Sequence, residues 1–95
     1  MKNNNKVLIR LIVPELDQAF DVFVPINEIM WKVKKLLAKS ISDLTGTSLD
    51  INGAYALINK ATSQPYDNNL IVANTDIRNA TELILLAVKK NSVGL

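Results

Sequence analysis

The chain has 95 residues, a net charge of +2 and neither cysteine nor histidine. This length corresponds to a single domain, and two surplus charges are too few for a nucleic-acid-binding surface. Without thiol or imidazole side chains, Ser–His triads, thiol enzymes and ordinary zinc sites are excluded. The nine acidic residues are scattered along the chain. We therefore predict a protein that is not an enzyme and that binds no metal, no cofactor and no nucleic acid.

The two ends of the chain are predicted to be flexible tails around one domain. Residues 1–6 are basic and rich in asparagine. The apolar run that follows is interrupted by Arg10 and stops at Pro14, unlike a signal peptide. No stretch reaches the roughly 20 apolar residues of a membrane span. We expect a cytoplasmic protein without membrane insertion, with its domain over residues 7–88 and a loose tail over residues 89–95.

Residues 7–24 have the pattern of a β-hairpin. Apolar residues alternate in the first run, which puts its odd-numbered side chains on the inner face and Leu8, Arg10 and Ile12 on the other. Residues 14–18 carry turn chemistry. The second run places Phe20, Val22 and Val24 inward and Asp21 and Phe23 outward. Strand, short polar turn and strand together predict two antiparallel neighbours.

A helix is predicted after Pro25. Asn27 is the expected N-cap, and Gly46 is the expected left-handed stop. With Ile29 as the origin of the helical wheel, one stripe is predicted to face the core; its members are Val33, Leu36, Leu37, Ser40, Ile41 and Leu44. This is the longest periodic segment in the chain.

The second half of the chain reads as short strands and turns. We predict strands over residues 54–59 and 81–88, and Tyr66 as a possible start of a short edge strand. Residues 70–73 fit either a helical turn or an extended segment. Hairpin, helix and further strands give an α+β fold: a mixed sheet of four to five strands, with the helix across one face and the first and last strands parallel at its centre.

That element order resembles the β-grasp of ubiquitin-like proteins, and the segment over residues 74–85 resembles the ubiquitin-like signature. In this signature an isoleucine precedes a tight turn and a Leu-x-Leu closing strand. The resemblance implies that Ile77 fills the core beneath the helix and that Leu83 and Leu85 point inward.

Within these proteins the chain resembles the YukD-like (EsaB-like) accessory proteins of type VII, or WXG100, secretion in Gram-positive bacteria. The resemblance rests on residues 20–25, on Ile58-Asn59-Lys60 and on residues 76–79. It implies a non-catalytic accessory or regulatory role in that secretion system. Ubiquitin and the related sulfur carriers end in Gly-Gly, whereas this sequence ends in Val93-Gly94-Leu95, so conjugation and sulfur carriage are disfavoured.

The sheet face opposite the helix is the predicted protein-binding surface. Its expected members are apolar apart from one arginine: Leu8, Arg10, Ile12, Tyr55, Leu57, Ile84, Leu86 and Val88. An apolar patch of this breadth is unusual on a small monomer. The alternatives are that the tail or lysine and arginine stems cover it, or that it is tolerated apolar surface. A self-associating homodimer without a secretion role is the alternative function.

Trp31 is a possible second interface because it lies away from the predicted core stripe. The alternative is that its ring folds over the loop around Pro25. Four helix lysines, Lys32, Lys34, Lys35 and Lys39, have few acidic neighbours. We interpret them as a solvated helix face, with contact to nucleic acid or to an acidic partner as the other possibilities.

Overall fold

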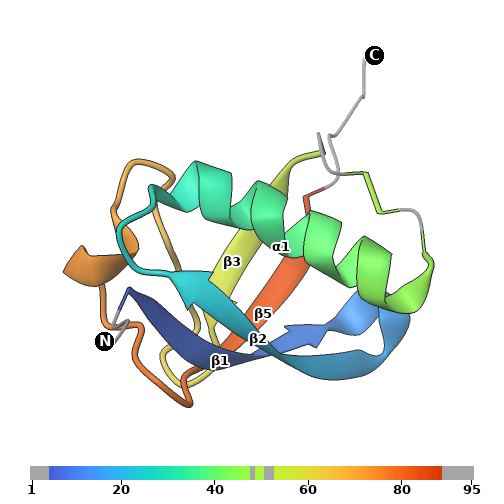
Figure 1. Ribbon diagram of the computed structural model, residues 1–95, viewed down its shortest axis with the longest axis horizontal. Helices are drawn as coiled ribbons and strands as arrows, with labels where there is room; N and C mark the ends of the chain where they lie inside the picture. Colours follow the sequence, from blue (N-terminus) through green and yellow to red (C-terminus); the bar gives the residue numbers. More distant parts are fainter. Residues whose placement is uncertain (1–4, 48, 51–52, 89–95) are drawn as a thin grey trace.

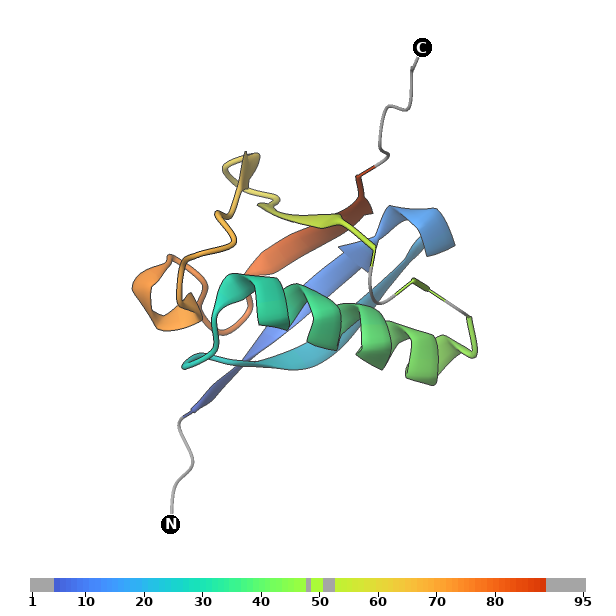
Figure 2. The ribbon, with the colours of Figure 1, turned by 90° about the horizontal axis from the view of Figure 1, so that it is seen from above.

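The computed structural model describes residues 5–47, 49–50 and 53–88. Five strands form one mixed sheet in the order β2-β1-β5-β3-β4, and β1 pairs in parallel with β5. One helix lies across one face of this sheet (Figures 1 and 2). In chain order the elements are β1 (Lys6–Val13), β2 (Gln18–Pro25), α1 (Met30–Thr45), β3 (Tyr55–Asn59), β4 (Gln64–Pro65) and β5 (Glu82–Ala87), with 3-10 turns at Pro14–Leu16 and Val72–Asn74. This is the predicted ubiquitin-like β-grasp fold of the α+β class.

The core lies between α1 and the sheet. Its buried members come from every main element: Ile9, Leu11, Val13, Val22, Val24, Met30, Val33, Leu37, Ile41, Leu57, Val72, Ile77, Leu83 and Leu85. The predicted inward residues of the hairpin and of β5 are among them, and Phe20 packs against the same cluster. Ile77 is 2% exposed. The expected position of this side chain within the core is confirmed.

The helix begins later than the sequence predicts. Its N-cap is Ile29, which makes no side-chain cap hydrogen bond. Instead, the N–H of Met30 donates to the carbonyl of Leu70 at 2.8 Å, and the N–H of Trp31 donates to the carbonyl of Asn68 at 3.2 Å. The loop before β5 therefore supplies acceptors that a capping side chain would otherwise provide, and the predicted N-cap at Asn27 is wrong.

The buried stripe of α1 is rotated from the predicted one. It consists of Met30, Val33, Leu37, Ala38 and Ile41. Leu36 is 45% exposed, Leu44 is 65% exposed, and Ser40 is also exposed. Assignment of these three residues to the core is wrong, because the stripe centres closer to Met30. The predicted stop is confirmed: Gly46 has a φ of 72°, and its N–H donates to the carbonyl of Ser42 at 2.9 Å.

The side chains of β3 are one residue out of the predicted phase. Leu57 pairs with Leu85, and Ile58 pairs with Ile84. Residues opposite one another in a sheet share a face, and Leu85 points into the core. Leu57 is accordingly 0% exposed, and Tyr55 packs against the core cluster. The assignment of Tyr55 and Leu57 to the face opposite the helix is wrong, and Ala56 and Ile58 point that way instead.

The other differences from the prediction concern the edge strand, the segment over residues 70–73 and the start of β1. The short edge strand ends just before Tyr66, at Pro65. Residues 70–73, which fit either a helical turn or an extended segment, combine both conformations. Ile71 forms a β-bridge with Ile29, and Val72 starts a 3-10 turn. Lys6, assigned to the first tail, is the first residue of β1. Residues 1–4 and the predicted C-terminal tail over residues 89–95 lie outside the described residues.

Candidate functional site

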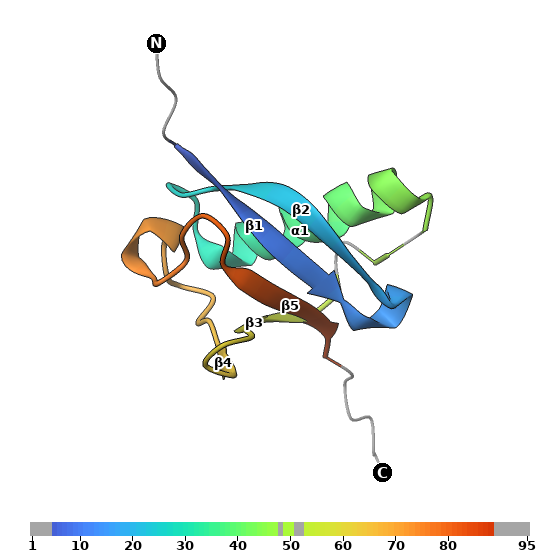
Figure 3. The ribbon, with the colours of Figure 1, turned by 90° about the horizontal axis from the view of Figure 1, so that it is seen from below.

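The face of the sheet turned away from α1 is the candidate binding surface (Figure 3). We call it the open face. Its side chains come from four neighbouring strands and the residues that directly follow them: Ala19, Asp21 and Phe23; Leu8, Arg10 and Ile12; Glu82, Ile84, Leu86 and Val88; and Ala56, Ile58 and Lys60. Their shared orientation follows from the pairings of β1 with β2 and β5, and of β5 with β3.

An apolar row crosses the middle of the open face. Ile12 on β1 pairs with Ile84 on β5, and Ile84 pairs with Ile58 on β3. All three are half-buried within the chain. Leu86 and Ala56 form the next pair on the same face, and Leu8, Phe23 and Val88 are exposed at its margins. The isoleucine row continues into Leu86, Ala56 and Val88 as one apolar strip, whereas the Leu8–Phe23 pair lies on the far side of the charged Arg10–Asp21 pair.

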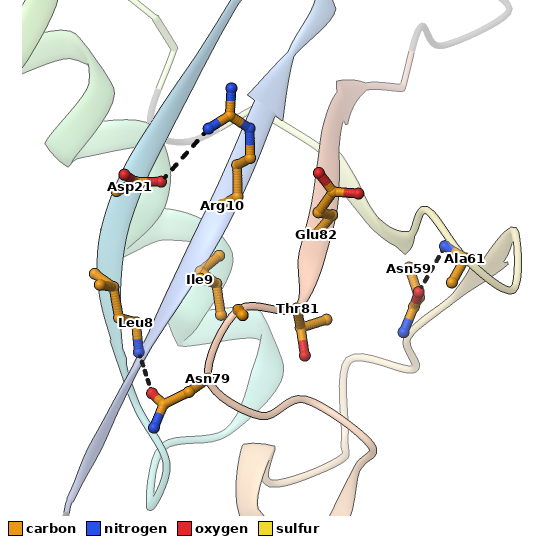
Figure 4. A pocket seen from close by; sticks show the side chains of 10 residues that line it. Leu8, Ile9, Arg10, Asp21, Asn59, Ala61, Asn79, Thr81 and Glu82 are labelled. Carbon is orange, nitrogen blue, oxygen red and sulfur yellow. Dashed lines mark hydrogen bonds and ion pairs between the residues drawn. The ribbon is translucent and has the colours of Figure 1, made fainter.

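A row of alternating charges lies beside the apolar row. Arg10 pairs with Asp21 on one side and with Glu82 on the other, and the N–H of Lys60 donates to the carbonyl of Glu82 at 3.0 Å. The order across the sheet is therefore Asp21, Arg10, Glu82 and Lys60. The Arg10 Nη1 to Asp21 Oδ1 distance is 3.9 Å (Figure 4), and the Lys60 Nζ to Glu82 Oε1 distance is 3.6 Å. All four side chains are about half exposed, so these pairs contribute little to folding stability.

A shallow hollow of about 850 Å³ lies at the end of the open face where the charge row meets the loop before β5. This loop is fixed to β1 by three hydrogen bonds. The Leu8 N–H donates to Asn79 Oδ1 at 2.8 Å, the Ala80 N–H to the Leu8 carbonyl at 2.8 Å, and the Arg10 N–H to the Thr81 carbonyl at 3.0 Å. Figure 4 shows Leu8 and Asn79 on one side of the hollow and Asn59 on the other. The two carboxylates in the wall of the hollow are already paired, Asp21 with Arg10 and Glu82 with Lys60.

The sequence correctly places six of its eight candidate residues on the open face. These are Leu8, Arg10, Ile12, Ile84, Leu86 and Val88. The two misplaced residues are Tyr55 and Leu57. The predicted set lacks four charged or apolar members of the face: Ile58, Asp21, Lys60 and Glu82. The alternation of β2 indicates Asp21, but the other three depend on pairing between strands far apart in sequence.

A polar cluster supports the β3 end of the sheet. Asn59 is 6% exposed, and its side-chain NH₂ donates to Tyr66 Oη at 3.0 Å and to Asp76 Oδ2 at 3.4 Å. Its Oδ1 accepts the N–H of Ala61 at 2.9 Å. The Tyr66 hydroxyl donates to the Asp76 carboxylate. Burial, followed by this hydrogen bond, raises the pKa of Tyr66 to about 12. The cluster thus ties β3 to the loops before and after η2 (Val72–Asn74).

The contribution of Tyr66 to stability is expected to disappear at high pH. Because folding raises the pKa of Tyr66 above its ordinary value of 10.0 to about 12, its stabilising effect is complete below pH 10 and lost as the pH rises through 12. We expect the difference in unfolding free energy between wild type and Tyr66→Phe to shrink between pH 8 and pH 12. Urea titrations at both pH values measure it. An unchanged difference would contradict the assigned role of the hydroxyl.

Trp31 lies on the exposed side of α1 and is 41% exposed. Its backbone joins the loop at Asn68, and its ring has Lys32 Nζ and Lys35 Nζ each 5.5 Å from its centroid. Two of the four helix lysines face carboxylates, since Lys39 Nζ lies 3.3 Å from Asp43 Oδ2 and Lys32 Nζ lies 4.0 Å from Glu28 Oε1. Trp31 therefore sits among cations, which is consistent with a solvated, partly paired helix face.

Lys34, the remaining helix lysine, is held by the loop. Its Nζ donates to Asn68 Oδ1 at 2.6 Å, and burial lowers the pKa of Lys34 against a smaller opposing effect of Asp67. In the described part of the chain, no three Asp or Glu side chains gather closely enough to hold a metal ion. No helix there combines the length and apolar character needed to span a membrane.

No protein-family model and no curated protein matches the sequence, but the fold matches solved structures. A chain of the toluene 4-monooxygenase HD complex with the inhibitor 4-bromobenzoate has a TM-score of 0.71 at 10% identity, over 87% of this chain and 99% of that one. The C-terminal ubiquitin-like domain of human 2'-5'-oligoadenylate synthetase-like protein has a TM-score of 0.65 at 16% identity, over 100% and 98%.

The EccD5 ubiquitin-like domain from Mycobacterium xenopi is similar to this chain with a TM-score of 0.65 at 14% identity, over 90% of this chain and 98% of that one. Identities this low establish the ubiquitin-like fold alone. The same fold in a chain of a monooxygenase complex illustrates that function must be argued from the surface and not from the fold.

Proposed function

We propose that this protein is a non-catalytic ubiquitin-like module that binds another protein through its open face. The observation that carries this proposal is the apolar row of Ile12, Ile84 and Ile58, on a face that no helix among the described residues covers. Contiguous apolar surface on a small domain is typical of a docking site. The neighbouring charges would orient the partner, since polar rims give an interface its specificity.

The cellular setting that we propose is a bacterial type VII secretion system, with this chain as a cytoplasmic accessory or regulatory component. Two features support it. The sequence resembles the YukD-like accessory proteins, and the fold is similar to the EccD5 ubiquitin-like domain, which belongs to a type VII system. A gene neighbourhood that encodes WXG100 substrates and a membrane ATPase would add support from outside the structure.

Charges introduced into the apolar row are expected to abolish partner capture. The double variant Ile84→Asp/Leu86→Asp buries two carboxylates in any interface formed there, which costs several kcal/mol and reduces binding more than a hundredfold. Affinity purification of tagged protein from its source cells, with mass spectrometry of bound proteins, measures the effect. We expect type VII components with the wild type and none with the variant.

The matched control is Leu36→Asp/Leu44→Asp, which introduces the same charges at exposed leucines of α1. It should capture the same components as the wild type. Circular dichroism of both variants confirms that they fold. Equal capture by Ile84→Asp/Leu86→Asp and the wild type would show that the open face is not the docking surface.

A further inference from the structure

The charge row of the open face alternates in sign from strand to strand, which also pairs neighbouring charges within the sheet. Across β2, β1, β5 and the end of β3, its signs are negative, positive, negative and positive, from Asp21, Arg10, Glu82 and Lys60. The midpoint of the row lies between β1 and β5. Reversal of the row about this midpoint puts every charge opposite one of the other sign.

We propose that a second copy of this chain binds the open face, related by a twofold axis that runs along the strands between β1 and β5. This inference rests on the proposed docking role of the open face and adds a second copy of the chain as a further, reversible occupant. In this arrangement Asp21 faces Lys60 of the second copy, and Arg10 faces Glu82 of the second copy. Twofold symmetry repeats both contacts, so all eight charges of the two rows are opposed by a charge of opposite sign.

The apolar residues agree with the same axis. Ile12 on β1 and Ile84 on β5 are a directly paired couple on either side of the axis, so Ile12 packs on Ile84 of the second copy. Sheets that pack face to face lie about 10 Å apart with their strands within about 30° of each other. An arginine side chain from one sheet and a glutamate side chain from the other together span that distance. Ion pairs between the two charge rows can therefore form beside the packed isoleucines.

A twofold axis across the strands does not fit the same residues. If it passed through the charge row, Arg10 would face Arg10 of the second copy and each other charge would face its own equivalent. If it passed through the apolar row, Glu82 would lie over Leu86 of the second copy and Lys60 over its Ala56, both without a charged partner. Like charges in contact and unpaired charges buried against apolar surface both oppose binding. The pattern therefore selects one of the two ways to stack the sheets.

The contact area sets the expected strength of this dimer. Four strands spaced about 4.8 Å apart and six residues long give a footprint of about 20 Å by 20 Å. A footprint of about 400 Å² per copy is well below the roughly 800 Å² per partner of a stable interface and is in the range of weak, transient association. The dimer should therefore dissociate on dilution, which leaves the open face of the monomer accessible to another protein.

Two opposite charge reversals test the proposal with purified protein. In a dimer of the Arg10→Glu variant, two carboxylates would face each other at positions 10 and 82. In a dimer of the Glu82→Arg variant, two guanidinium groups would face each other at the same positions. Each variant alone should dimerise at least tenfold more weakly than the wild type in sedimentation velocity. Mixed in equal amounts, the two variants should form a heterodimer of near wild-type affinity, because every facing pair is then of opposite sign.

Lys39→Glu and Asp43→Arg are the matched controls, since they change the net charge by the same amounts on exposed residues of α1. Alone or mixed, they should sediment like the wild type. Three results would overturn the proposal: a wild type that stays monomeric up to about 1 mM, single reversals that do not weaken the dimer, or a mixture that associates no better than its components. None of these bears on the capture experiment, in which Ile84→Asp/Leu86→Asp tests docking to a different protein.

Discussion

Replacement of Leu57 by alanine is expected to lower the unfolding free energy by about 3 kcal/mol, whereas Ile58→Ala should cost less than about 1 kcal/mol. Leu57 is 0% exposed and belongs to the core cluster, while its neighbour Ile58 points to the open face. Loss of a fully buried leucine side chain leaves a cavity as well as removing buried apolar area. Urea unfolding of the two variants gives the two free energies.

Aspartate at the same positions makes the contrast sharper. Leu57→Asp would bury a carboxylate among apolar side chains, and most or all of the marginal stability of a domain this small would be lost. Ile58→Asp should remain folded, because the new carboxylate reaches solvent. A folded Leu57→Asp together with an unfolded Ile58→Asp would mean that β3 is paired one residue away from the register described here.

The second large effect is expected at adjacent leucines of α1. Leu37 is 3% exposed and Leu36 is 45% exposed. We expect Leu37→Ala to lower the unfolding free energy by about 3 kcal/mol and Leu36→Ala to lower it by less than about 1 kcal/mol. Both substitutions remove the same atoms from the same residue type and place alanine, the best helix former, in the helix. The difference therefore reports burial alone.

Thermal or urea unfolding of this pair also tests how the helix is rotated. The predicted stripe includes both leucines, so it would give two losses of similar size. Similar losses of unfolding free energy from Leu36→Ala and Leu37→Ala would mean that both leucines are buried, as predicted from the sequence. That result would contradict a buried stripe centred closer to Met30. Circular dichroism before unfolding confirms that each variant keeps its helix.

Local sequence signals predicted the parts of the fold that local chemistry determines. The hairpin follows from period-two alternation bounded by Pro14 and Pro25, and the end of α1 follows from the freedom of Gly46 to adopt a positive φ. The position of Ile77 came from the resemblance to ubiquitin-like proteins. The parallel pairing of β1 with β5 followed from the arrangement expected for this order of elements, and the strongly apolar character of both strands agreed with it.

The errors arose where distant segments decide the outcome. The start of α1 depends on carbonyl groups of the loop at residues 68–70, which no N-terminal signal reveals. The phase of β3 was ambiguous because Tyr55, Ala56, Leu57 and Ile58 are all apolar, so alternation could not choose a face. The charge row needs the register of three strand pairs, and its members lie as far apart as residues 10 and 82.

Binding of a protein at the open face can be measured directly through three isoleucines that lie on it. Methyl NMR of protein labelled at isoleucine reports Ile12, Ile58 and Ile84 on the open face and Ile9, Ile41 and Ile77 in the core. On addition of a captured partner, or on concentration of the protein itself, we expect shifts and broadening in the first three signals and little change in the core signals. Unchanged signals from Ile12, Ile58 and Ile84 in a demonstrably formed complex would contradict binding at the open face.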